Sequence, residues 1–84
     1  MSEHQIKRWT LTYPCDGDPT MAVVTDGKVA SMILIDLTWE RGISGLYHRR
    51  VGRMVATKPV PDYVLRETAR LARLFNAQRG RVSA

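Results

Sequence analysis

The stretch of sequence that decides the fold is residues 20–37, TMAVVTDGKVASMILIDL. Two apolar arms flank Asp26-Gly27, and Asp-Gly is a preferred central pair of type I′ turns because both residues must adopt positive φ. The stretch therefore predicts a β-hairpin with strands over about 20–25 and 28–37, joined by a type I′ turn. The second arm is almost entirely apolar, which is typical of a central strand with both faces at least partly covered.

Residues 6–13 precede this hairpin and alternate between the two sides of a strand. Trp9, Leu11 and Tyr13 share one face, while polar residues occupy the other. Such period-two alternation, rich in aromatic and β-branched residues, is the signature of a half-buried strand. Two prolines and a glycine in residues 14–19 then indicate a loop. Together with the hairpin, this strand predicts a three-stranded antiparallel meander.

The stretch 39–55 is ambiguous between helix and strand. Its apolar residues recur at near-helical intervals, and Thr38 is a suitable helix N-cap. Each of its three glycines would cost about 1 kcal/mol in a helix interior. A strand over 46–51 would instead place Arg49 on the same face as Tyr47 and apolar neighbours, which breaks the alternation. A helix over part of 39–55 is the favoured interpretation, and a strand is the alternative.

An amphipathic helix is predicted at about 62–78. The two prolines of residues 58–61 favour extended backbone before it, and Asp62 is a good N-cap. Apolar residues then fill one broad arc at 100° per residue. Three members of this arc are expected to pack on the sheet: Leu65, Ala72 and Phe75.

The expected fold class is therefore α+β, in a single small domain over 1–84 that ends in a frayed basic tail at about 79–84. Cys15 is the only cysteine, so no disulfide can form within the chain, and a reducing cytoplasm is the expected location. The longest apolar run covers residues 29–35, whereas a membrane helix needs about 20 residues, so no membrane association is expected.

Charge is distributed very unevenly along the chain. Residues 1–40 carry three cations and six anions, and residues 41–84 carry ten cations and two anions, which gives −3 and +8 within a net charge of +5. Nine of the ten cations in the second half are arginines. Arginine grips phosphate or carboxylate groups with a planar fork of donors, so this asymmetry points to a polyanionic partner.

Six arginines are the candidate binding residues. Helical spacing places Arg66, Arg70 and Arg73 within about 60° of one another, on the side of the predicted helix away from its apolar arc. The other three lie close together earlier in the chain: Arg49, Arg50 and Arg53. The plainer interpretation of the helical three is a solvated helix face, in which Glu67 pairs with Arg70.

No catalytic, cofactor or metal site is predicted. Cys15 lies near Asp16 and Asp18, and the chain also holds His4 and His48. Structural zinc sites use four Cys or His ligands, and the chain has only three such residues. A nucleophilic cysteine needs a base held in place by a third group, and no spacing indicates one.

The aromatic residues are interpreted mainly as core, although stacking on unpaired bases is the alternative. Of Trp9, Tyr13, Trp39 and Tyr47, Trp39 is the one expected to be partly exposed, because it stands beside charged Glu40 and Arg41.

These observations favour a small, non-enzymatic accessory or regulatory protein that binds DNA or RNA through its arginine-rich half, mainly by phosphate contacts. The alternative is a protein-binding inhibitor or adaptor module, of the kind encoded on mobile elements, that docks its basic face on an acidic partner surface. Both hypotheses are compatible with a monomer or a homodimer.

Overall fold

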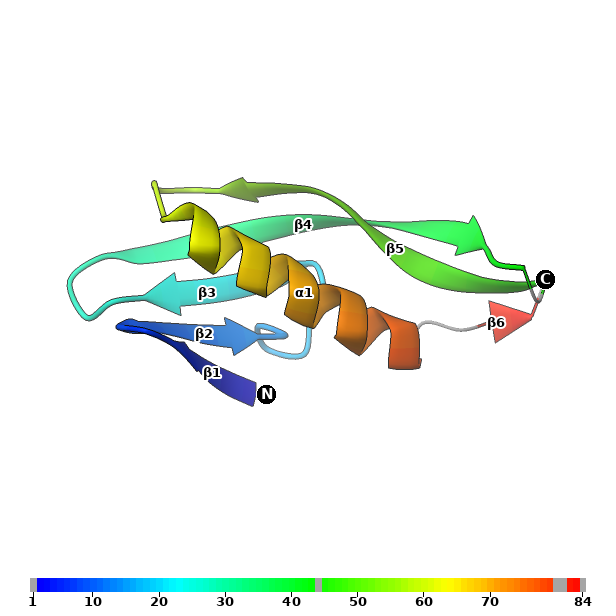
Figure 1. Ribbon diagram of the computed structural model, residues 1–84, viewed down its shortest axis with the longest axis horizontal. Coiled ribbons are helices and arrows are strands. Elements are labelled where there is room, and N and C mark those ends of the chain that lie inside the picture. Colours follow the sequence, from blue (N-terminus) through cyan, green and yellow to red (C-terminus); the bar gives the residue numbers. More distant parts are fainter. Residues whose placement is uncertain (1, 44, 80–81, 84) are drawn as a thin grey trace.

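A computed structural model describes residues 2–43, 45–79 and 82–83. In this part of the chain, six strands form one antiparallel sheet in the order of the sequence, and one helix lies across a face of the sheet (Figure 1). The elements are β1 (Ser2–Ile6), β2 (Trp9–Tyr13), β3 (Met21–Thr25), β4 (Ala30–Arg41), β5 (Leu46–Ala56), α1 (Asp62–Arg79) and β6 (Val82–Ser83). The predicted α+β class is confirmed, but the meander is longer than the predicted three strands.

The single strand predicted over 6–13 is two strands. Lys7 adopts a positive φ of 55° and turns the chain, so that Ile6 of β1 pairs with Trp9 of β2. The side-chain amide of Gln5 donates to the Lys7 carbonyl at 2.8 Å and closes this turn. The alternation predicted beyond the turn is confirmed, because Trp9, Leu11 and Tyr13 are all buried.

The hairpin of β3 and β4 is confirmed, but the turn at Asp26-Gly27 is not type I′. Only Gly27 has positive φ, at 93°, which is the sign pattern of a type II′ turn. The Asp26 carboxylate accepts hydrogen bonds from the backbone N–H groups of Lys28 and Val29, both at 2.9 Å. This side-chain turn holds Asp26 at negative φ.

The type I′ geometry occurs instead at the other Asp-Gly pair. Asp16 and Gly17 both have positive φ, at 52° and 79°, and the Asp18 N–H donates to the Cys15 carbonyl at 2.9 Å. The Thr20 hydroxyl and then its backbone N–H donate to the Asp18 carboxylate and lower the pKa of that group. Residues 14–19 thus form the expected loop between β2 and β3.

Replacing Gly27 with alanine is expected to lower the free energy of unfolding by about 1–2 kcal/mol, because a Cβ is strained at positive φ. An added Cβ would meet no atom within 4 Å, so the cost is conformational and not steric. The matched control is Gly52→Ala, since Gly52 lies outside the positive-φ region and its added Cβ would be 3.6 Å from the Asp36 carbonyl oxygen. If denaturant melts show the same loss of unfolding free energy for Gly27→Ala and Gly52→Ala, the cost does not come from the positive φ of Gly27.

The helix favoured for part of 39–55 is wrong, and the strand alternative is correct. β4 continues to Arg41, and β5 returns antiparallel to it, with Trp39 paired to Arg49. Between the pairs Ile35–Met54 and Leu37–Val51, β5 advances three residues while β4 advances two, so β5 contains a β-bulge. The extra residue gives the β5 apolar positions a near-helical spacing, which explains the error.

The core lies between α1 and the inner face of the sheet. Val64, Thr68 and Ala72 are fully buried at i, i+4 intervals along the helix, whereas Leu65 and Phe75 are half-buried at the edge of this line. The burial predicted for Ala72 is confirmed. The sheet contributes the rest of the buried apolar side chains: Trp9, Leu11, Tyr13, Ala22, Val24, Ile33 and Ile35.

A buried polar link fixes the helix on β2. The Asn76 amide donates to the Tyr13 hydroxyl at 3.0 Å and to the Ala72 carbonyl at 2.8 Å, and the Tyr13 hydroxyl donates to the Pro19 carbonyl at 2.8 Å. The Tyr13 ring also meets Phe75 edge-on, with 5.4 Å between ring centroids. Burial raises the pKa of Tyr13, so the hydroxyl stays protonated and keeps its donor.

The helix begins at the predicted cap residue, Asp62, and the Pro61 carbonyl accepts hydrogen bonds from the backbone N–H groups of Val64 and Leu65. The expected tail contributes Arg79 to the end of α1 and Val82–Ser83 to β6, which pairs with β5; residues 80, 81 and 84 lie outside the described part. Across the described residues, no helix is both long and apolar enough to cross a membrane.

Candidate functional site

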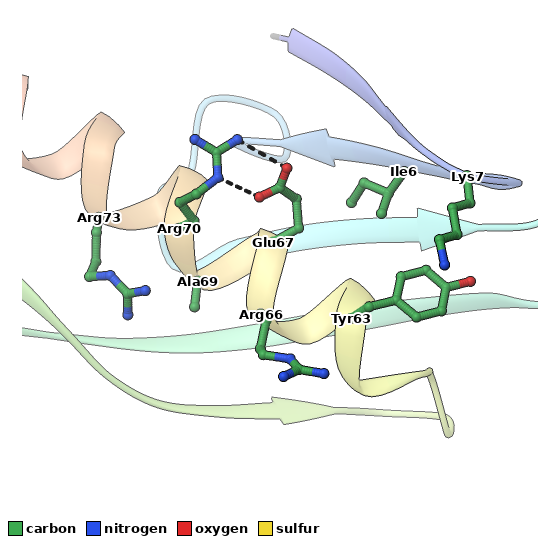
Figure 2. Close-up of a pocket in the computed structure, with 8 residues that line it drawn as sticks. All are labelled: Ile6, Lys7, Tyr63, Arg66, Glu67, Ala69, Arg70 and Arg73. Atoms are coloured by element: carbon green, nitrogen blue, oxygen red, sulfur yellow. Dashed lines mark hydrogen bonds and ion pairs between the residues drawn. The ribbon is translucent and has the colours of Figure 1, made fainter.

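The three helix arginines lie on the exposed side of α1, as their spacing predicts. Arg66, Arg70 and Arg73 are all exposed, while the buried line of the helix faces the sheet. Their side chains nevertheless diverge. Figure 2 shows Arg70 on the β1 side of the helix, beside Glu67, and Arg66 and Arg73 extending towards the β5 side.

Lys7 joins these arginines around an open hollow of about 610 Å³ between α1 and the β1–β2 turn (Figure 2). The Lys7 ammonium lies 4.6 Å from the centroid of the Tyr63 ring, a cation–π contact that holds the turn against the first turn of the helix. The residues that line the hollow are Ile6, Lys7, Tyr63, Arg66, Glu67, Ala69, Arg70 and Arg73. Four cations therefore surround it against one carboxylate.

The carboxylate of Glu67 is already paired with Arg70. The Arg70 guanidinium donates to it through both Nε and Nη2, with 3.0 Å between Nη2 and Oε2. This pairing lowers the pKa of Glu67 and raises the pKa of Arg70, so both groups stay charged at neutral pH. Arg70 is consequently less available to a ligand than Arg66 and Arg73.

Arg73 also lines a second hollow, of about 380 Å³, on the β5 side of the helix. The other lining residues are Arg49, Arg50, Val51 and Ala77. Arg73 is therefore shared by the two hollows, and it connects the helix arginines to the β5 arginines, which lie far apart in the sequence. Five cations have their side chains on the helix side of the sheet and are called the basic helix surface below: Lys7, Arg49, Arg66, Arg70 and Arg73.

The three β5 arginines do not act as one cluster. Arg49 lies on the helix side of the sheet, with its guanidinium carbon 4.6 Å from the centroid of the Trp39 ring. Strand alternation sends the Arg50 side chain to the other face, where it is 3.5 Å from Glu40 in an exposed ion pair. Arg53 is exposed and lines neither hollow.

Sequence reasoning missed Lys7 and Tyr63 as site residues. The signal for Lys7 depends on the turn that splits the first predicted strand, and residues 2–5 carry no apolar pattern that could reveal β1. Within the described residues, no group of three His, Cys, Asp or Glu side chains could hold a metal ion. Cys15 and Asp18 form an isolated bridge that closes the type I′ turn.

Comparison of the chain with family models, with curated proteins and with solved structures gives no match. Its function is therefore inferred from the chemistry of its own surface.

Proposed function

We propose that this protein binds nucleic acid, DNA or RNA, as a non-enzymatic accessory or regulatory factor, and that the basic helix surface contacts the phosphate backbone. The observation that carries the proposal is the position of Arg73, which lines both hollows and so makes one surface of five cations. Glu67 is the single carboxylate among the residues that line them. Neutralising phosphates with such cations releases counterions, which supplies affinity that depends on salt.

Two aromatic rings at the basic helix surface favour an unpaired strand as the ligand. Tyr63 lines the first hollow, and Trp39, 48% exposed, lies under Arg49. Exposed aromatic rings beside a basic groove stack on the bases of single strands, whatever their sequence. Because phosphate and stacking contacts carry little sequence information, we expect similar affinity for unrelated sequences.

The test is a series of binding titrations with labelled single-stranded DNA, single-stranded RNA and duplex DNA, each in two unrelated sequences, between 50 and 200 mM salt. We expect micromolar or tighter binding that weakens steeply as salt rises, with little difference between sequences. The absence of salt-sensitive binding to every probe would overturn the proposal.

The second candidate function is docking of the same surface on an acidic protein, as an inhibitor or adaptor module. The observation that favours it is Leu74, which is 50% exposed beside Arg73 on α1. An exposed leucine contributes to a protein interface but has no partner on a phosphate backbone. Under this function the titrations above would show little binding. For either function we propose a cytoplasmic location, in keeping with the unpaired thiol of Cys15.

Replacing Glu67 with glutamine is expected to strengthen nucleic-acid binding. The change removes the carboxylate that occupies Arg70, so one more cation becomes available to a phosphate. The slope of log affinity against log salt should steepen by up to about 0.9. The control is Glu40→Gln, which releases Arg50 from its ion pair on the other face of the sheet and should leave the slope unchanged. Equal slopes for wild type and Glu67→Gln would contradict the role given to Arg70.

A further inference from the structure

The face of the sheet opposite α1 carries exposed apolar side chains at its centre. Met32 and Leu34 alternate along β4 with the buried Ser31, Ile33 and Ile35, so they point away from the helix. Leu34 is 45% exposed. An antiparallel sheet with one solvated face normally presents polar side chains there. Exposed apolar side chains on this face therefore indicate that another surface packs against it.

The apolar area extends across three neighbouring strands. Met21 and Val23 of β3 pair with Leu34 and Met32, and Val55 of β5, which is 46% exposed, pairs with Leu34 from the other side. Paired residues share a face, so these five side chains form one continuous area, called the outer patch below. In the described part of the chain, α1 is the only element that covers the sheet, and it lies on the inner face (Figure 1).

Two opposite charges border the outer patch. Asp36 follows Leu34 by two positions on β4, and Arg53 precedes Val55 by two positions on β5, which places both side chains on the outer face. Both are exposed, and neither belongs to an ion pair within the described residues.

The cross-strand register makes this border self-complementary. A two-fold axis that runs parallel to the strands, between β4 and β5, exchanges the positions of neighbouring residues on the two strands. Leu34 of one copy then faces Val55 of the other, and Asp36 faces Arg53. Symmetric dimers use such surfaces, in which one patch provides both halves of each contact.

We propose that the outer patch is a homodimer interface, in which two copies of the chain pack their sheets face to face about this axis. Packed sheets lie about 10 Å apart, and both helices then face outwards. The basic helix surfaces remain free on opposite sides of the dimer.

The first test measures the mass of the full chain in solution by light scattering and sedimentation, over a range of concentrations at 150 mM salt. Wild type should reach twice the chain mass. Leu34→Lys should raise the dissociation constant at least about 10-fold, because it buries an unpaired charge. The matched control is Leu74→Lys, which alters a leucine of similar exposure on α1 and should leave the dimer intact. Circular dichroism confirms that each variant is folded.

The second test reverses the bordering charges. Asp36→Arg and Arg53→Asp should each weaken the dimer, because like charges then face each other, and the double exchange should restore it. The proposal is overturned if wild type is monomeric at all concentrations. It is also overturned if the chain associates only with a different protein and not with a second copy of itself. A dimer that survives Leu34→Lys, or single reversals that the double exchange does not rescue, overturns it as well. The nucleic-acid titrations measure a different face, so their outcome is independent.

Discussion

The variant in which Arg49, Arg66 and Arg73 are all replaced with glutamine is expected to bind nucleic acid with a salt slope lower by about 2–3. Each of these side chains contributes a cation to the hollows beside α1, and none forms an ion pair within the described residues. If each contacts one phosphate, each accounts for about 0.9 of the slope. The loss should be similar for unrelated sequences, as expected for contacts that position the backbone.

The matched control removes the same net charge from other parts of the molecule. Arg8, Lys28 and Lys58 are exposed and line neither hollow, so their triple change to glutamine alters the net charge equally without touching the basic helix surface. We expect it to lower the slope much less, because these three side chains do not line the hollows proposed to contact the phosphates. Equal effects for the two triple variants would mean that net charge, and not this surface, determines binding.

Leu11→Ala is expected to lower the free energy of unfolding by about 2–5 kcal/mol. Leu11 is fully buried at the centre of β2, where it pairs with Val24 under the helix, so its removal leaves a cavity. Domains unfold with roughly 5–15 kcal/mol, and a chain of this size has a modest core, so the change consumes a large part of the total.

Denaturant unfolding at an unchanged m-value measures this loss. Leu74→Ala is the control, because Leu74 is half-exposed on α1 and alanine is a good helix former, so the change should cost less than about 0.5 kcal/mol. A midpoint for Leu11→Ala that matches wild type would show that β2 does not lie in the core.

The elements that could be predicted from the sequence are those with one regular period and a clear boundary. Trp9, Leu11 and Tyr13 alternate without interruption, and α1 follows a proline pair and keeps its apolar arc for its whole length. The prediction for 39–55 was wrong because the bulge of β5 opposite Asp36 shifts the strand period by one residue. In addition, Arg49 lies on the inner face of β5, where its side chain packs on the Trp39 ring and not in the core.

The candidate site was predictable only where its residues share one element. Helical spacing identified Arg66, Arg70 and Arg73 as neighbours. It did not show that the Arg70 side chain turns away from the other two to pair with Glu67, because that depends on its rotamer. Lys7 and Arg49 reach α1 through the sheet topology, which the sequence did not reveal. Strand parity separates Arg50 from Arg49, although the two are adjacent in sequence.

The two tryptophans occupy contrasting environments, and this makes the protein its own fluorescent reporter. Trp9 is 4% exposed in the core, whereas Trp39 is 48% exposed beneath Arg49. Soluble quenchers should therefore reach Trp39 and spare Trp9. Blue-shifted, protected emission would follow the integrity of the core, and red-shifted, quenchable emission would follow events at the end of the β4–β5 hairpin. One unlabelled sample can thus register unfolding and surface occupancy as separate optical signals.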